Sequence, residues 1–426
     1  MLLKKRIPFS LVEISLYFLP LSLIAGSLVV NLNILVFLTF GLAYLAINKI
    51  KISFNISNIL LFLFFVFVIF SSYLNLEVIG LNNFIKSFLL LKFFFLYLIV
   101  EILIKEEKIN FKFFFYICLV LITLLSLDLL LQFFYGKNIL GYEPWEGRIT
   151  GIFEHEAIAG AYLQKIFIFS LAGVAIIFNQ KNSTNFLLST LLLIIIILGS
   201  YVASNRISFL ILLVTIFILI AFFSIFRKRL IISLFILLPI FFLIYQSDNQ
   251  TNIKYKGFVY KIIKLSEIKK SNDIEIINQE EILIKNSLPN HGKIFLTAYK
   301  SFNDNKIFGN GLKSFRYKCN NFLKEENSLC STHPHNYHLE VLHDTGLVGF
   351  IILSLFVLTV LFNSIKFILI KKNLYYEKLI LSLIVLNFLI EIFPIKSTGS
   401  LFTTWNGTLL WASIALINVR KFNYSR

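Results

Sequence analysis

Six histidines occur in this 426-residue chain, and four of them fall within eleven positions: His333, His335, His338 and His343. They belong to the segment Ser331 to Phe350, STHPHNYHLEVLHDTGLVGF, which joins a long polar stretch to an apolar run. An imidazole has an ordinary pKa of about 6.5, so it can take a proton from a hydroxyl at neutral pH. Pro334 favours an extended His333 and so helps to fix His335. We therefore expect His335 to act as a general base, with the other three as supporting groups.

Two other interpretations of these histidines stay open. His335 and His338 are three positions apart, as metal ligands can be, but neither an HExxH motif nor a Cys or Asp set at ligand spacing accompanies them. We therefore expect no metal and no other cofactor, although Glu154 and Glu156 are carboxylates that could recruit Mg²⁺ near a phosphate. The second alternative is a surface histidine that is simply hydrogen-bonded in its loop.

Arginines supply the second part of the expected chemistry, because their fixed charge can neutralise a leaving group such as a diphosphate. Arg206 follows Ala203-Ser204-Asn205 between two apolar runs. A charged side chain at that position costs free energy unless it is paired, faces water or reaches the membrane–water interface as an anchor. A second polar segment, Lys137 to Ala157, contains Arg148 and Glu156. No nucleotide-sugar motif is visible, so these residues suit sugar transfer from a lipid diphosphate.

The elements that must position these residues are membrane helices. The chain is 58% hydrophobic and only 15% charged, which excludes a set of soluble domains. Spanning the hydrocarbon layer takes about 20 apolar residues in a helix. We expect an all-α polytopic fold with about twelve such spans: 8–27, 28–47, 56–75, 84–104, 111–135, 158–178, 186–203, 207–226, 230–246, 345–369, 379–395 and 403–419.

The distribution of Lys and Arg predicts the orientation, since cytoplasmic loops retain positive charge. With the N-terminus inside, eighteen of these residues are cytoplasmic and the short outer loops carry four: Lys137, Arg148, Arg206 and Lys396. Both termini are then cytoplasmic, and the net charge of +17 is a topology signal that requires no nucleic-acid partner. Three parts follow: helices 1 to 9 in 1–246, an outer loop in 247–344, and helices 10 to 12 with a tail in 345–426.

The outer loop changes character along its length. Its first half, Asp248 to about Asn290, is rich in Lys, Glu and Asn, and we expect it to be partly irregular. From His291 onward, Ile294, Ala298 and Phe302 are spaced as one face of a helix. A turn is expected after this helix at Asn310-Gly311.

Two further features surround the histidines. Cys319 and Cys330 both fall in the outer loop, where an oxidising compartment would let them pair, although two free thiols remain the alternative. Cys118 lies inside a span and is interpreted as a packing residue. At the next span we expect Asp344 or Thr345 to cap the helix. Gly346 and Gly349, one turn apart, would let membrane helices approach closely and hold His335 at the surface.

Together, His335-Asn336, nine intervening residues and Gly346-Leu-Val-Gly349 resemble the signature of the O-antigen ligase and O-antigen polymerase superfamily. These proteins are membrane glycosyltransferases of bacterial lipopolysaccharide assembly. The resemblance covers most of the chain. It includes twelve spans, a large periplasmic loop between the ninth and tenth, and Ser204-Asn205-Arg206 after the seventh.

The resemblance implies an inverting, metal-independent transfer at the periplasmic face of the bacterial inner membrane. Ligases move a glycan from undecaprenyl diphosphate to a hydroxyl of lipid A-core, whereas polymerases extend the glycan on the carrier; a twelve-helix transporter is the remaining alternative. By this match His335 is the base or the acceptor-orienting residue, and Arg206 contacts the diphosphate. The place of a second ligase arginine is taken by His291, and Arg316 or Arg148 could substitute for it. Asn336 and Glu156 complete the expected substrate-binding set.

Overall fold

The computed structural model describes residues 2–52, 54–106, 109–178, 182–203, 205–248, 255–256, 289–325, 327–370 and 375–417. Within these ranges the chain is helical and has no β-strand, apart from one isolated bridge between Trp145 and Arg148. The expected all-α class is confirmed. The expectation for Asp248 to Asn290 concerns a segment that lies almost entirely outside these ranges.

A helix lies at each of the apolar runs: α1 Leu2–Ala25, α2 Ser27–Ile47, α3 Ile56–Leu74, α4 Leu76–Leu89, α5 Leu91–Lys105, α6 Phe111–Tyr135, α7 Ala159–Ile177, α8 Ser183–Val202, α9 Arg206–Phe222, α10 Ser224–Ser247, α15 Tyr337–Ile370, α16 Tyr375–Glu391 and α17 Thr404–Ile417. In the described part of the chain, eight helical stretches are long and apolar enough to cross a membrane, α4 and α5 counting as one. The protein is therefore an all-helical membrane protein, and the number of twelve spans stays a prediction.

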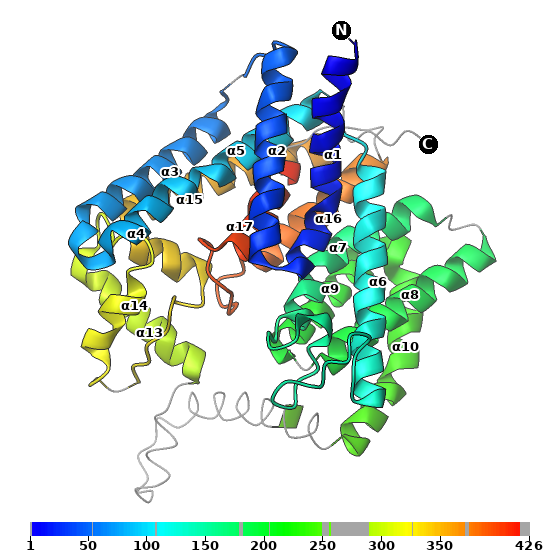
Figure 1. Ribbon diagram of the computed structural model, residues 1–426. Coiled ribbons are helices and arrows are strands. Elements are labelled where there is room, and N and C mark those ends of the chain that lie inside the picture. Colours follow the sequence, from blue (N-terminus) through cyan, green and yellow to red (C-terminus); the bar gives the residue numbers. More distant parts are fainter. Residues whose placement is uncertain are drawn as a thin grey trace, which may run out of the picture. The chain divides into compact units, whose positions relative to one another are not determined.

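The chain divides into two compact units, drawn in Figure 1. Unit 1 comprises Met1–Asn110 and Ile276–Arg426, and unit 2 comprises Phe111–Glu275. In unit 1, α3 packs along α15 and α5 along α17, while in unit 2 α6 packs on α7 and α8. The histidine segment belongs to unit 1. Arg206, Arg148 and Glu156 belong to unit 2.

A small helical layer lies beside the start of α15 in unit 1 (Figure 1). It consists of α13 Asn290–Phe302, η2 Asn303–Asn305, α14 Phe315–Lys318 and η3 Cys319–Phe322. Ile294, Ala298 and Phe302 are buried on one face of α13, as the sequence predicts. Cys319 joins this small core and is disulfide-bonded to Cys330, with their Cα atoms 5.3 Å apart. The disulfide thus closes the loop just ahead of the histidines.

The tenth expected span begins earlier than its hydropathy indicates. Helix α15 starts at Tyr337, because the Asn336 side chain accepts a hydrogen bond from the Leu339 N–H at 3.0 Å and so caps the first turn. The expectation that Asp344 or Thr345 caps a helix beginning there is therefore wrong. Both residues are buried inside the helical stretch.

The regular path of α15 is interrupted at Gly346, whose φ of 63° is in the left-handed region. The 306–311 loop pairs with the backbone groups around this break. Leu347 and Val348 donate to the carbonyls of residues 306 and 307 at 2.8 and 3.2 Å, and the carbonyls of residues 343 and 344 accept from Asn310 and Gly311 at 2.9 and 3.0 Å. The break therefore leaves these buried polar groups satisfied.

The two glycines of the motif consequently have different neighbours. A Cβ atom on Gly346 would collide with the carbonyl oxygen of Ile307 and the amide nitrogen of Gly309, so this glycine approaches a loop and not a membrane helix as expected. Gly349 faces α3, where a Cβ atom would lie 3.1 Å from a ring carbon of Phe67. The close approach expected between membrane helices thus applies to Gly349 alone of the pair.

Candidate functional site

Three histidines from two separate segments meet in unit 1. The ring centroids of His333 and His335 are 4.0 Å apart, and those of His291 and His335 are 5.0 Å apart. His291 lies in the first turn of α13, and the other two precede α15. The fold therefore brings the residue at the expected place of the second ligase arginine directly against His335. We call these three residues the histidine cluster.

The segment between α16 and α17 covers the histidine cluster. The Thr398 N–H donates to the His335 carbonyl at 2.8 Å, and the Thr398 carbonyl lies 3.4 Å from His333 Nε2. Ser397 Oγ lies 3.3 Å from His291 Nδ1. No role was predicted for this segment, although a signal for it exists in the sequence: the polar run Lys396-Ser-Thr-Gly-Ser400 between two apolar runs.

His335 itself has an uncommon backbone conformation. Its φ is 54°, a left-handed value that is uncommon outside glycine, although asparagine, aspartate and histidine adopt it more often than other residues do. The ring is partly buried, and Nε2 lies 3.0 Å from Ser331 Oγ. Strained backbone of this kind persists where the surroundings determine it, and it recurs at functional sites. Here the bond to Thr398 and the anchored residue Asn336 hold it.

Asn336 connects the cluster to the rest of unit 1. Its side chain is only 2% exposed, and Nδ2 donates to the carbonyls of Pro394 and Lys396 at 2.6 and 3.2 Å. Because Oδ1 also caps α15, the amide is fully engaged with backbone groups. The structure therefore places this predicted substrate-binding residue in a position that orients His335 and the covering segment.

The environment of the cluster favours neutral imidazoles. Burial, followed by the neighbouring His291, lowers the pKa of His335, and burial lowers the pKa of His291. Burial and the adjacent His335 lower the pKa of His333 to about 4. A neutral imidazole can accept a proton, so the geometry allows His335 to act as a base at neutral pH.

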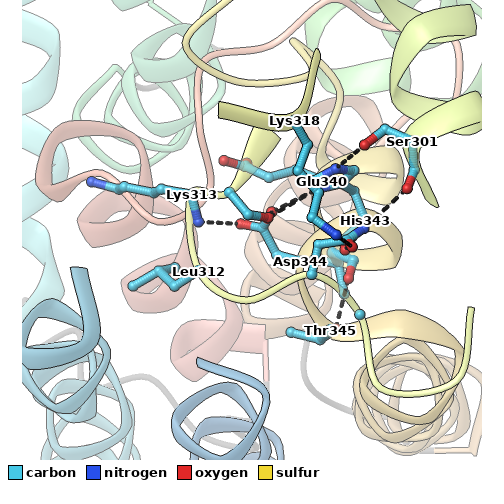
Figure 2. A network of polar contacts seen from close by, with 12 residues as sticks. Ser301, Leu312, Lys313, Lys318, Glu340, His343, Asp344 and Thr345 are labelled. Carbon is cyan, nitrogen blue, oxygen red and sulfur yellow. Dashed lines mark hydrogen bonds and ion pairs between the residues drawn. The ribbon is translucent and has the colours of Figure 1, made fainter. Parts of the chain in front are cut away.

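The other two histidines of the motif have structural contacts. His338 Nε2 lies 2.6 Å from the carbonyl of Ile392, the residue that follows the end of α16. His343 is fully buried, with Nε2 3.0 Å from Ser301 Oγ and Nδ1 2.9 Å from Asp344 Oδ1, as Figure 2 shows. This order of Ser, His and Asp is that of a hydrolase triad. Because all three side chains are at most 1% exposed, however, they stabilise the junction between α13 and α15.

Arg316 lies in α14 of the same unit, near enough that its charge contributes to the lowered pKa of His333. The other predicted site residues lie in unit 2. Arg206 is the first residue of α9 and is partly exposed, while Ser204 of its motif lies outside the described residues. Arg148 and Glu156 are both exposed on the segment between α6 and α7. Their roles stay predictions.

Two further features bear on ligands. In the described ranges, no group of three or more His, Cys, Asp or Glu side chains is arranged to hold a metal ion. An apolar cavity of about 330 Å³ lies among α15, α16 and α17; its wall includes His338, Phe388 and Trp411. Tyr337, two positions after His335, also lines this cavity.

Comparison with known families finds a match in the part of the chain that carries these residues. Residues 188–354 match the O-antigen ligase family, and this range contains both Arg206 and His335. No curated protein matches the chain.

Proposed function

Through residues 188–354 the chain belongs to the O-antigen ligase and polymerase superfamily, whose members are glycosyltransferase-like enzymes, and from that premise we propose that it is a ligase. The donor is a glycan on undecaprenyl diphosphate, and the acceptor is a hydroxyl of lipid A-core at the periplasmic face of the inner membrane. The proposal includes twelve spans with both termini in the cytoplasm. Extension of the glycan on its carrier, the polymerase reaction, would use the same chemistry.

In the proposed reaction His335 takes the proton of the acceptor hydroxyl as its oxygen attacks the anomeric carbon of the donor sugar. The bond between that carbon and the diphosphate oxygen breaks, so the configuration inverts and undecaprenyl diphosphate leaves with the electron pair. Arg206 is proposed to stabilise the diphosphate charge. The observation that carries this assignment is the histidine cluster, which keeps His335 neutral and partly exposed in a fixed left-handed conformation.

The test separates the imidazole from the backbone conformation. His335→Asn removes the base but keeps a residue that tolerates a positive φ, whereas His335→Ala removes the base and places an alanine in a backbone conformation that costs it about 1–2 kcal/mol. We expect both variants to be inserted in the membrane and to lose transfer by at least about a hundredfold. His155→Asn, in an exposed loop of unit 2, is the matched control and should retain activity. Transfer by His335→Asn at the wild-type rate would remove His335 from the chemistry.

The absence of a metal requirement is part of the same proposal. Purified protein should transfer glycan in excess EDTA, because arginine and lysine side chains offset the diphosphate charge. Complete loss of transfer in chelator, restored by one added divalent cation, would show that the reaction depends on a metal.

A further inference from the structure

Two cationic side chains close to the histidine cluster form no ion pair with any residue in the described part of the chain. Arg316 is partly buried, and its Nε atom is buried without a hydrogen-bond partner. Lys313 is also partly buried, and its Nζ atom makes no hydrogen bond or ion pair with any described residue. A buried donor without a partner costs about 1–3 kcal/mol, and more when the group is charged, so this arrangement favours an anionic ligand.

The backbone at Lys313 is fixed by several contacts. Its N–H donates to Asp344 Oδ2 at 2.7 Å, and the preceding Leu312 N–H donates to Ser72 Oγ at 3.2 Å. Lys313 has a φ of 58°, again in the left-handed region. Figure 2 shows that its side chain extends away from Asp344 and the buried network. The fold therefore holds this amine outside the hydrogen-bonded network of Asp344.

A third cation lies on α4, at the junction with α14. Asn83 Nδ2 donates to the hydroxyl of Tyr317, next to Arg316, at 3.1 Å, and Lys86 Nζ lies 3.4 Å from Asn83 Oδ1. Lys86 is exposed and so flanks the two partly buried cations.

The charges of these three groups act on one another. Burial, then repulsion from Lys86 and Arg316, lowers the pKa of Lys313. The nearby carboxylates of Glu340 and Asp344 oppose this shift, but both are bound elsewhere. Glu340 accepts from Ser400 Oγ and the Leu401 N–H, and Asp344 binds His343.

We propose that Lys313, Arg316 and Lys86 form the binding site for the diphosphate of the lipid donor in unit 1. The inference rests on the proposed function, and it supplies the phosphate contact that the histidine at position 291 cannot make with a fixed charge. A guanidinium donates in a fork that matches phosphate oxygens, and an ammonium adds a point charge. Two linked phosphates present enough negative charge and enough oxygens to engage all three cations.

The experiment measures binding directly, with full-length protein in nanodiscs and undecaprenyl diphosphate as the probe. Lys313→Asn removes the charge and keeps a residue that tolerates a positive φ. Arg316→Gln removes the second charge. We expect the double variant to bind the probe at least about tenfold more weakly, as the loss of charged hydrogen bonds implies. Lys300→Gln is the matched control, because this cation of α13 is already paired with Glu325 at 2.6 Å, and it should bind normally.

Charge-retaining variants and a second lipid make the result specific. Lys313→Arg and Arg316→Lys should keep most of the binding, which distinguishes lost charge from a misfolded site. The double substitution should weaken the binding of undecaprenyl monophosphate less than the binding of undecaprenyl diphosphate. Equal losses for the two lipids would overturn the diphosphate assignment and indicate a general anion site.

The inference and the proposed function can fail separately. Wild-type binding of the diphosphate lipid by the double variant, or transfer with an unchanged KM for the donor, would overturn the inference and leave glycan transfer standing. Binding that falls as expected in a protein that transfers no glycan would support the site and overturn the proposed function.

Discussion

At the scale of single residues, the proposed chemistry depends on a neutral and partly exposed His335 imidazole. Its ring contacts are Ser331, His333 and His291, and none of these described contacts is a carboxylate. Burial disfavours the imidazolium, and the neighbouring imidazole of His291 disfavours it further. The site therefore favours a proton acceptor whose pKa lies below that of a free imidazole.

This environment determines the expected pH dependence. The base must be neutral, and its pKa lies below the ordinary value of about 6.5. The transfer rate should therefore rise with pH through a midpoint below about 6.5 and remain level above it. His291→Gln removes one cause of the lowered pKa, so the midpoint should move to higher pH. Initial rates at saturating donor would measure both profiles; a midpoint above the ordinary histidine value would contradict the assignment.

At the scale of secondary-structure elements, the break in α15 joins the outer layer to the membrane helices. The 306–311 loop fills the break with backbone hydrogen bonds, and Ser71 of α3 donates to the Asp344 carbonyl at 2.7 Å. His343 and Asp344, on the same turn, bind Ser301 of α13 and the Lys313 amide. The segments that carry the histidine cluster and the cations are therefore anchored at one point.

Gly346 is the residue on which this junction depends. Gly346→Ala should lower the free energy of unfolding by about 1–2 kcal/mol through the left-handed φ alone. The collision of the new Cβ atom with backbone atoms of residues 307 and 309 should lower it further. Gly80→Ala is the matched control, since Gly80 has a φ of 72° and no atom within 4 Å of an added Cβ. Thermal unfolding of the two variants in detergent would measure the difference. Similar midpoints would show that the loop can move aside.

The elements differ in how far the sequence could predict them. The apolar runs and the face of α13 were predicted because burial in lipid or in a small core imposes a local hydrophobic pattern. The start of α15 was not predicted, because its first turns, YHLEVLHD, contain many polar residues and are held by Asn336, Glu340 and His343 through contacts with distant segments. The contact of the covering segment at Thr398 with the histidines was not predicted for the same reason, since the residues it contacts are more than 60 positions away in the sequence.

At the scale of the whole molecule, the predicted site residues are divided between the two units. His335 and the proposed diphosphate site of Lys313 and Arg316 belong to unit 1, whereas Arg206 belongs to unit 2. The family match from 188 to 354 covers part of each unit. Spacing along the chain could indicate the candidate site residues, but it could not indicate which residues of one unit contact each other in the fold. The meeting of His291 with His335 appears only in three dimensions.

The same chemistry serves a ligase and a polymerase, because in both a hydroxyl displaces a lipid diphosphate from a sugar. The acceptor distinguishes them, and the products on lipid A-core therefore report which reaction occurs. We expect a deletion strain to lose all glycan attached to the core and to accumulate polymer on the lipid carrier. Gel profiles of lipopolysaccharide, with analysis of the carrier-linked fraction, would measure both.

Complementation connects that profile to the site. The wild-type chain should restore the attached polymer, and so should His155→Asn, whereas His335→Asn should leave the deletion profile unchanged although it is present in the membrane. A single repeat left on the core of the deletion strain would identify a polymerase, because a separate ligase would then be attaching unextended glycan. In that outcome His335 keeps its role as the base, but the hydroxyl it deprotonates belongs to a carrier-linked glycan and not to lipid A-core.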